Sequence, residues 1–482
     1  MVKVKLEIPA LDMKHELAVI KENKLDSRSF LQGALIGSAV GAAILTAYQY
    51  FHTILKQPKL VSKAVFSNLD DFDSEEARAF FITAENIRAG FELRHLKNGE
   101  HRYILHAGYR NFRESWARDF GFAAFGLLAL EEYDVVRDTL AAFFLYQAQD
   151  GRLPVKLQSM GVFSRYLHTL FGREQSTSPI LTPKYVTGHG SSSLDGQALL
   201  IIAAAQDAIQ RSDYEFVTLN WDILRRAVRW LESKTRSVDH PLLFQRAYAD
   251  WADSVDRHGI GLYTNVLYWK ALGLMAQLAN KLNFPEDGDN YRVLADKVRT
   301  AIQDILWMPN SGYYASTDTL NQFSSAGNLL AVAWGLATQD QGNSILDFLK
   351  RNGLADPVPT QVAYPPYPNK LIAVENRIGG LGIYHTDGAW LWIGAWHAIA
   401  LAKYGRKKEA RDVLAAIAGI IVRDQQVHEV YRTDGQPLSN FWYKSEAPLT
   451  WSAGMVIYAY KIVGEYFDET TDLKHLAGQL VR

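Results

Sequence analysis

The sequence contains no cysteine among its 482 residues, which removes several kinds of chemistry at once. Disulfides, thiolate nucleophiles and cysteine-ligated zinc are all excluded. Lysine and arginine (51) nearly balance aspartate and glutamate (52), and no long basic block is present. Because the phosphates of nucleic acids are bound by clustered Lys and Arg, we expect no nucleic-acid partner.

Several motifs of phosphate, acyl and metal chemistry are also missing. The chain has no glycine-rich phosphate loop and no G-x-S-x-G elbow. His189 and Asp195 offer one imidazole and one carboxylate, without the spacing that zinc or iron ligands usually show. We therefore expect neither a catalytic metal nor a cofactor.

The N-terminal region differs from the rest of the chain. Residues 1–28 are polar and mixed in charge, whereas residues 29–51 contain no charged residue. A helix of that length would reach about 34 Å, close to the thickness of a bilayer core. Gly33, Gly37 and Gly41 repeat with G-x-x-x-G spacing, on which another helix can pack closely. We expect a membrane anchor of unknown orientation that could also support a homo-oligomer. The alternative is a packed helix or a flexible leader on an otherwise cytoplasmic protein.

After a linker at residues 52–75, the dominant pattern is apolar residues at helical spacing. Strand-like alternation is scarce, and no Pro-, Ser- or Gly-rich linker divides residues 76–482. About a dozen helices would fit an open solenoid or a closed toroid of helical hairpins. No strict repeat of about 34 or 40 residues is visible, which disfavours the solenoid. We predict an all-α fold, with one large domain after a separate N-terminal helix.

Polar motifs fall just before the predicted helices. In a closed toroid, such loops would converge at one end of the barrel and build a single cleft from distant parts of the chain. These motifs occupy residues 101–119, 187–195, 248–256, 375–387 and 428–434.

Two of these motifs carry acidic residues suited to acid and base work. Asp250, Asp253 and Asp256 are crowded beside Trp251. Crowding and aromatic contact both oppose ionisation, so one carboxyl there could remain protonated as a general acid. An acidic cap at a helix start would explain the same residues. Glu429 lies in an apolar stretch before a turn, although a surface hairpin with an exposed Glu is the alternative.

Two further segments could line the same cleft. Arg118 and Asp119 are adjacent and could hold sugar hydroxyls, with Trp116 nearby as a wall, although a helix-capping ion pair would also explain them. Residues 384–392 place polar groups before an aromatic-rich helix, which fits either a sugar pocket or an ordinary helix start with a Trp core.

In this order, six segments resemble motifs of the helical-barrel glycosidases, and most of all those of the alkaline/neutral invertase family. The resemblance covers roughly residues 100–465 and implies an (α/α)6 barrel that cleaves a saccharide by general acid/base catalysis. The segments are Trp116-Ala117-Arg118-Asp119-Phe120, Gly151-Arg152-Leu153-Pro154, residues 323–332, residues 384–390, His428-Glu429-Val430-Tyr431 and residues 449–454.

The chain departs from the invertases at the acid motif. It has Trp251-Ala252-Asp253-Ser254-Val255 where they have Met-Ile-Asp-Arg-Arg, and this looks closer to glycogen-debranching glucosidases. The missing Arg pair puts sucrose specificity in doubt. The resemblance implies Asp253 as the acid and Glu429 as the base, with Asp250 and Asp256 as rivals for the acid and Glu446 for the base. It also implies a saccharide-binding set of Trp116, Arg118, Asp119, Tyr248, Trp251, His385, Asp387 and Trp390.

Three functions remain open at this point, and all share the predicted fold. The first is an inverting hydrolase of a short glucosyl saccharide, such as sucrose or a related α-glucoside. The second is a debranching-type glucosidase that acts on longer α-glucans. The third is a catalytically inactive, membrane-anchored sugar-binding or scaffold protein.

Overall fold

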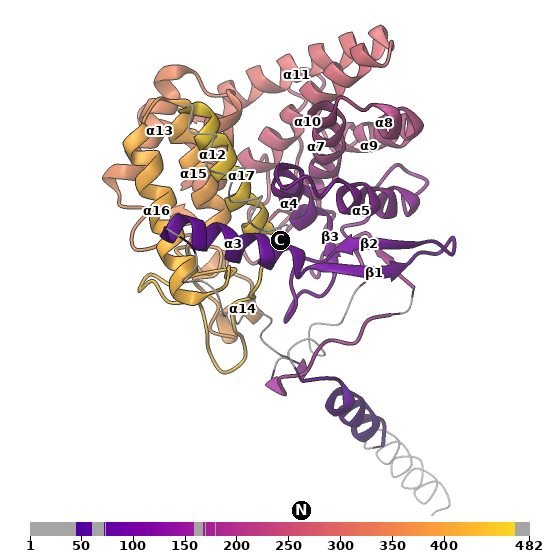
Figure 1. Ribbon diagram of the computed structural model, residues 1–482. Helices are drawn as coiled ribbons and strands as arrows, with labels where there is room; N and C mark the ends of the chain where they lie inside the picture. Colours follow the sequence, from indigo (N-terminus) through magenta and orange to yellow (C-terminus); the bar gives the residue numbers. More distant parts are fainter. Residues whose placement is uncertain are drawn as a thin grey trace, which may run out of the picture. The chain divides into compact units, whose positions relative to one another are not determined.

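The computed structural model describes residues 45–59, 72, 74–158, 167–168, 170–178 and 180–467 (Figure 1). The chain divides into two compact units, Met1–Pro58 and Lys59–Arg482. In the first unit, residues 45–56 form a helix. Within the described ranges, no helix is long and apolar enough to cross a membrane. Residues 1–28, residues 29–44 of the expected anchor and most of the expected linker lie outside these ranges.

The second unit is built from alternating inner and outer helices. The inner helices are α4 (Ala117–Ala129), α7 (Leu194–Arg211), α10 (Leu262–Lys281), α12 (Ser325–Trp334), α15 (Leu391–Lys403) and α17 (Thr450–Tyr466). The outer helices are α3 (Glu75–Arg88), α5 (Tyr133–Leu145), α9 (Trp221–Glu232), α11 (Pro285–Leu306), α13 (Gln339–Arg351) and α16 (Lys407–Asp424). Shorter elements are α8 (Glu215–Leu219), the 3-10 helix η2 (Asn369–Leu371) and α14 (Val374–Ile378).

The inner helices form a closed ring. Each packs against the next in chain order, and α17 packs back against α4 (Figure 1). The outer helices cover this ring, as α5 packs on α4, α11 on α10, α13 on α12 and α16 on α15. This arrangement is an (α/α)6 barrel, so the predicted fold class is confirmed.

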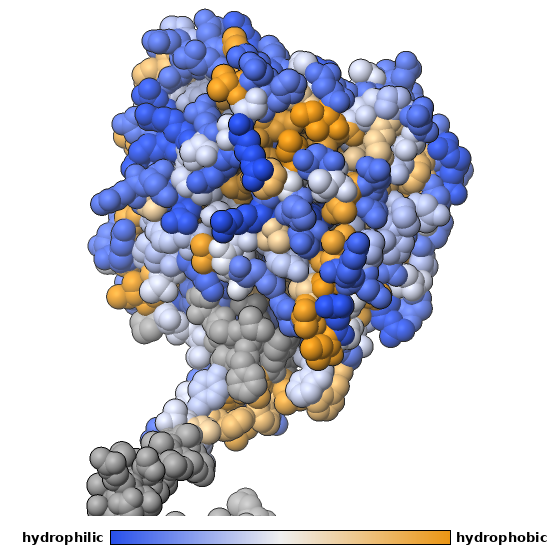
Figure 2. All heavy atoms as spheres, turned by 180° about the vertical axis from the view of Figure 1, so that it is seen from behind, coloured by the Kyte–Doolittle hydropathy of each residue, from blue (hydrophilic) through white to orange (hydrophobic). Residues whose placement is uncertain are grey.

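The two rings differ in sequence because they differ in surroundings. In α15 nearly every residue is buried, as expected for a helix enclosed on all sides. In α9 only one face is buried, and Leu224, Val228 and Leu231 on that face follow helical spacing. A continuous cluster of buried hydrophobic side chains connects the inner helices. Figure 2 shows hydrophilic side chains over most of one face of the molecule, with hydrophobic ones gathered in patches.

Short antiparallel sheets occupy the connections between helices, which the sequence analysis did not predict. The strands are β1 (Phe91–His95) and β2 (His101–Leu105), then β3 (Ser115–Trp116), β4 (Lys156–Leu157) and β5 (Pro183–Lys184), then β6 (Trp307–Met308), β7 (Tyr313–Thr317), β8 (Leu320–Ser324) and β9 (Ala363–Tyr364). β3 runs directly into α4, and β8 runs directly into α12. These strands therefore fix where two inner helices begin, at the end of the barrel that carries the polar motifs.

Candidate active site

A cavity lies among the loops that lead into the inner helices. The empty space between its side chains, including the open solvent at the mouth, is about 410 Å³. Its lining comes from distant parts of the chain and consists of Phe112, Trp116, Arg118, Asp119, Trp251, Asp253, Tyr384, His385, Trp390, Glu429, Leu449 and Trp451.

The cavity brings together both carboxylates that the resemblance implied as catalytic, and most of the implied binding residues. Tyr248 and Asp387 do not line it. The ring of Tyr248 instead lies 4.4 Å from that of His189, and Asp387 accepts a hydrogen bond of 2.6 Å from Thr386 Oγ1. The implied binding residues in the lining are Trp116, Arg118, Asp119, Trp251, His385 and Trp390.

Asp253 is the one member of its acidic cluster that lines the cavity. Its side chain is 34% exposed, and its Oδ2 lies 3.8 Å from Arg118 Nη1. Burial raises the pKa of Asp253, and the charge of Arg118 only partly opposes this. A carboxyl that holds its proton to higher pH, and that faces a cavity, is suited to donate that proton to a substrate.

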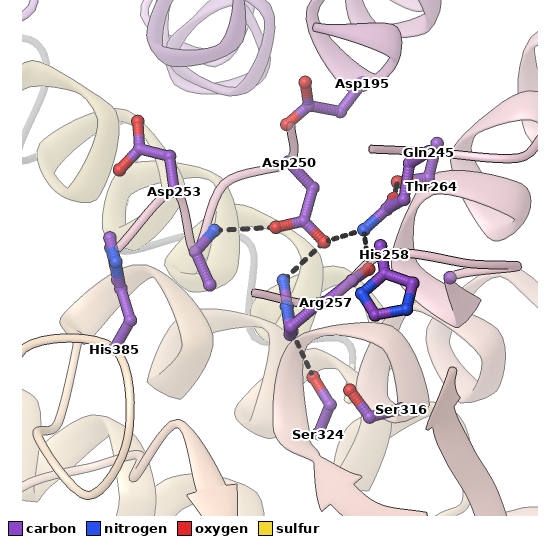
Figure 3. A network of polar contacts seen from close by, with 12 residues as sticks. Asp195, Gln245, Asp250, Asp253, Arg257, His258, Thr264, Ser316, Ser324 and His385 are labelled. Carbon is purple, nitrogen blue, oxygen red and sulfur yellow. Dashed lines mark hydrogen bonds and ion pairs between the residues drawn. The ribbon is translucent and has the colours of Figure 1, made fainter. Parts of the chain in front are cut away.

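The carboxylate of Asp250 forms hydrogen bonds and an ion pair within a network of buried polar groups (Figure 3). Its carboxylate accepts hydrogen bonds from the Ala252 backbone N–H at 3.0 Å and from Gln245 Nε2 at 2.9 Å. Arg257 Nη2 lies 2.6 Å from the same carboxylate. Figure 3 shows the Asp253 side chain pointing away from this network. Asp250 therefore holds the turn that carries Asp253 and does not face the cavity itself.

The other rival for the acid role, Asp256, is also engaged elsewhere. Its Oδ1 lies 2.8 Å from Nδ1 of His258, and its side chain is not part of the cavity lining. Position alone therefore separates Asp253 from both neighbouring carboxylates.

Arg118 is held in place by Asp195 at the start of α7. Nε and Nη2 of Arg118 lie 2.5 and 3.3 Å from the two carboxylate oxygens of Asp195, which is fully buried. Ser193 Oγ donates a further hydrogen bond of 2.5 Å to Asp195. This two-point contact fixes the guanidinium plane and leaves Nη1 towards Asp253. The sequence analysis considered Asp195 only as a metal ligand and did not foresee this contact.

Asp119 follows Arg118 at the start of α4 and also lines the cavity. Burial raises the pKa of Asp119 to about 7, although the charge of Arg118 lowers it. A carboxyl and a guanidinium side by side offer an acceptor and a donor, which suits recognition of neighbouring sugar hydroxyls.

Glu429 is buried, and each of its oxygens accepts a tyrosine hydroxyl. Tyr384 donates to Oε1 and Tyr443 to Oε2, and the Glu446 backbone N–H lies 3.2 Å from Oε2. Burial raises the pKa of Glu429 to about 8, while the two tyrosine hydrogen bonds oppose that shift. The donors fix the carboxylate and favour its charged form. Tyr384 stands in a motif that the resemblance singled out, whereas nothing in the sequence pointed to Tyr443.

Glu446, the rival for the base role, has a different task. It is fully buried and accepts backbone N–H groups from Tyr109 at 2.9 Å, from Arg110 at 2.6 Å and from Asn111. It does not line the cavity. Glu446 therefore shapes the turn that precedes Phe112.

Aromatic rings form the walls of the cavity. Trp251 makes edge contacts with His385 at 5.1 Å and with Trp390 at 5.7 Å, and His385 stacks on Trp390. Nδ1 of His385 lies 2.8 Å from Ser254 Oγ, and burial lowers the pKa of His385 well below its usual value. The imidazole is therefore neutral and serves as a wall. Trp451, Phe112 and Leu449 complete the lining and were not foreseen as site residues.

The described residues contain no group of three or more His, Cys, Asp or Glu side chains that could hold a metal ion. Two of the carboxyl groups that line the cavity, Asp253 and Glu429, stand in unlike environments. One lies partly open beside an arginine, and the other is buried under two hydroxyl donors.

Known proteins share the fold of this chain. Residues 155–351 match the bacterial α-L-rhamnosidase six-hairpin glycosidase domain. No curated protein matches the sequence at a significant level. Among solved structures, a Klebsiella oxytoca rhamnosidase with rhamnose bound has a TM-score of 0.58 and 15% identity, covering 82% of this chain. The match spans only 64% of that rhamnosidase.

Two similar structures correspond to this chain over almost their whole length. A GH63 mannosylglycerate hydrolase from Thermus thermophilus in complex with glucose has a TM-score of 0.57 and 16% identity, covering 80% of this chain and 99% of that one. A glycosidase variant in complex with glucose has a TM-score of 0.58 and 15% identity, covering 82% and 99%. The chain thus has the six-hairpin glycosidase fold, and residues 155–351 match a glycosidase domain.

Proposed function

We propose that the protein hydrolyses a glycosidic bond with inversion, using Asp253 as the general acid and Glu429 as the general base. The observation that carries this proposal is that two carboxyl groups, from loops far apart in the chain, line one cavity in unlike settings. Inversion needs one protonated and one ionised carboxyl on opposite sides of the bond that breaks. Burial raises the pKa of both carboxyl groups, that of Glu429 to about 8. The two hydroxyl donors favour the charged form of Glu429 and suit it to the base role, whereas Asp253 accepts no hydrogen bond within the described residues and suits the acid role.

The reaction follows from these roles. Asp253 gives its proton to the oxygen of the leaving group as the bond between that oxygen and the anomeric carbon breaks. Glu429 takes a proton from a water molecule, whose oxygen attacks the anomeric carbon from the opposite face. The product is a free sugar of inverted anomeric configuration. Arg118 and Asp119 hold hydroxyls of the sugar, and the indole walls exclude water from its ring.

We propose a glucosyl unit in a short saccharide as the substrate, such as sucrose or a related α-glucoside. The aromatic rings that line the cavity support a sugar ring as its occupant. Glucose bound in two of the similar structures supports a glucosyl unit, whereas the rhamnose of the third makes a rhamnoside the natural comparison. The proposal includes closeness to the invertase family. One alternative is a debranching-type glucosidase that acts on longer α-glucans. The other is a catalytically inactive, membrane-anchored sugar-binding or scaffold protein.

The test is product analysis by NMR with the purified full-length protein. Sucrose, trehalose, maltose, isomaltose, glycogen and an α-L-rhamnoside would be offered separately, and the anomer formed first would be identified. We expect inverted glucose from a short glucoside, and loss of that activity in Asp253→Asn and in Glu429→Gln. Asp256→Asn is the matched control, because that carboxyl does not line the cavity. Retention of configuration, or activity that survives Glu429→Gln, would contradict the assignment.

A further inference from the structure

Four large apolar side chains are exposed on two neighbouring segments of the barrel. They are Val374 (56% exposed) and Ile378 (82%) on α14, and Phe441 (73%) and Trp442 (56%) on a turn. Val374 and Ile378 are four residues apart on one helix, so they lie on the same side of it. The rings of Phe441 and Trp442 meet edge to face at 4.7 Å. We call these four side chains the rim patch.

The two segments of the rim patch are joined to each other. Asn440 Nδ2 donates to the Gly379 carbonyl at 2.8 Å, and Ile378 and Phe441 are the next residues along the chain. The side chain of Asn440 also accepts the backbone N–H groups of Trp442 and Tyr443, each at 2.9 Å, which closes the turn. Hydrogen bonds therefore hold the two segments of the rim patch in a fixed arrangement.

Each segment is also tied to one of the two catalytic carboxyl groups. On one side, the Ala373 backbone N–H donates to the Ser254 carbonyl at 2.8 Å, directly after Asp253. On the other side, Tyr443 follows Trp442 and donates its hydroxyl to Glu429. The rim patch therefore lies beside the active site and connects the acid segment to the base segment.

Three cationic side chains lie close to the rim patch in the sequence. Lys370, Arg377 and Lys444 are exposed and adjoin the patch in the chain, and none of them forms an ion pair within the described residues. One acidic side chain, Glu375 on α14, lies among these cations, and its Oε1 is 3.3 Å from His189 Nε2. The rim thus combines exposed apolar groups with unpaired cations.

We propose that the rim patch docks on a lipid surface that carries anionic head groups, with the mouth of the active site next to that surface. Exposed Trp, Phe and Ile side chains enter the boundary between head groups and acyl chains, and flanking Lys and Arg contact the phosphates. Such docking is peripheral and needs no membrane-spanning helix. It brings sugars borne on lipids within reach of the cavity, which goes beyond the proposed hydrolysis of a free saccharide.

Two other occupants fit the surface less well. A neutral saccharide would use the aromatic rings but would give the three cations no partner. A second copy of this chain, joined by a two-fold axis, would bring the same cations face to face. The charge of the rim therefore favours an anionic amphiphile over both.

The absence of cysteine from the chain makes a direct test possible, because any introduced cysteine is unique. An environment-sensitive fluorophore would be attached to the full-length protein through Phe441→Cys or Ile378→Cys. Leu219→Cys is the matched control, because Leu219 is 77% exposed on α8, well away from α14 (Figure 1). Each labelled protein would be mixed with phosphatidylcholine vesicles, with and without phosphatidylglycerol.

We expect the labels at positions 441 and 378 to brighten at least twofold with phosphatidylglycerol vesicles, and to be quenched by spin-labelled lipid. The label at position 219 should stay unchanged, even if another part of the chain binds the membrane. Lys444→Glu and Arg377→Glu should each weaken the affinity for phosphatidylglycerol vesicles about fivefold or more. The reason is that one cation near an anionic surface contributes about 1 kcal/mol to binding. Lys281→Glu, an exposed lysine on α10, is the charge control.

Three results would overturn the proposal. The first is no change at positions 441 and 378 with anionic vesicles. The second is an equal change at position 219, which would indicate unspecific adsorption. The third is a change that depends on protein concentration and not on lipid, which would indicate self-association or a protein partner. None of these readouts uses catalysis, so failure of the proposed hydrolysis would be seen separately.

Discussion

The hydroxyl of Tyr443 donates a hydrogen bond to Oε2 of Glu429, so the turn at the rim of the cavity reaches the carboxylate to which we assign the base role. This contact acts against burial, which raises the pKa of Glu429 to about 8. A donor to a carboxylate stabilises its charged form and so lowers its pKa. The pH dependence of the reaction should therefore respond to Tyr443 even though it does not line the cavity.

Replacing Tyr443 by Phe should move the limb of the pH profile that Glu429 governs to higher pH. Loss of one hydrogen bond to a charged group would raise the pKa of Glu429 by about one unit. We therefore expect kcat/KM at neutral pH to fall about tenfold, because less of the base is ionised. The measurement is kcat/KM against pH for both proteins. Tyr103→Phe, at an exposed position on β2, should leave the profile unchanged. A uniform fall without any shift would assign Tyr443 a purely structural role.

Substitutions of the neighbouring residues Asp253 and Asp250 should affect different properties, the first mainly activity and the second mainly stability. Asp253→Asn removes a carboxyl that makes no hydrogen bond within the described residues and whose ion-pair partner Arg118 is also held by Asp195. We therefore expect activity to be lost and stability to be nearly unchanged. Asp250→Asn leaves the buried Arg257 without its counter-charge, which should cost about 3–5 kcal/mol. Denaturant unfolding and initial rates on the same samples provide both numbers. If Asp253→Asn also unfolds the protein, the carboxyl has a structural role that the contacts do not show.

The raised pKa of Glu429 also has a consequence for stability. A carboxyl with a pKa of about 8 in the folded state and about 4.3 when unfolded binds more protons when folded between those values. Stability from this group is therefore complete below about pH 4 and is lost as the pH rises towards 8. Glu429→Gln cannot ionise and should escape that loss. The free energy of unfolding of the variant minus that of the wild type should therefore increase by about 2 kcal/mol or more as the pH is raised from 5 to 9. A difference that stays constant with pH would show that the carboxyl keeps an ordinary pKa.

The sequence predicted the inner ring and the general region of the site better than it predicted their details. Helical spacing and the loops before each helix were enough to place Asp253 and Glu429 at one end of the barrel, because every inner helix begins there. The contacts of Asp195 and Tyr443 were not predictable, because they join loops that the sequence keeps far apart and that carry no periodic signal. The resemblance implied Tyr248 as a pocket residue, but its ring lies against that of His189 and outside the cavity lining.

The close crossing of α4 and α17 allows a test of the ring itself. A Cβ added to Gly126 would lie 2.1 Å from the backbone oxygen of Gly454, so neither helix can move aside without disturbing the barrel. Alanine usually stabilises a helix relative to glycine by about 1 kcal/mol. Gly126→Ala should nevertheless destabilise the protein by about 3 kcal/mol, because the clash is with backbone. Gly273→Ala on α10 is the matched control, since a Cβ there meets nothing within 4 Å, and it should be neutral or stabilising. Equal effects of the two substitutions in denaturant unfolding would show that the ring is less tightly closed than the packing of α4 on α17 indicates.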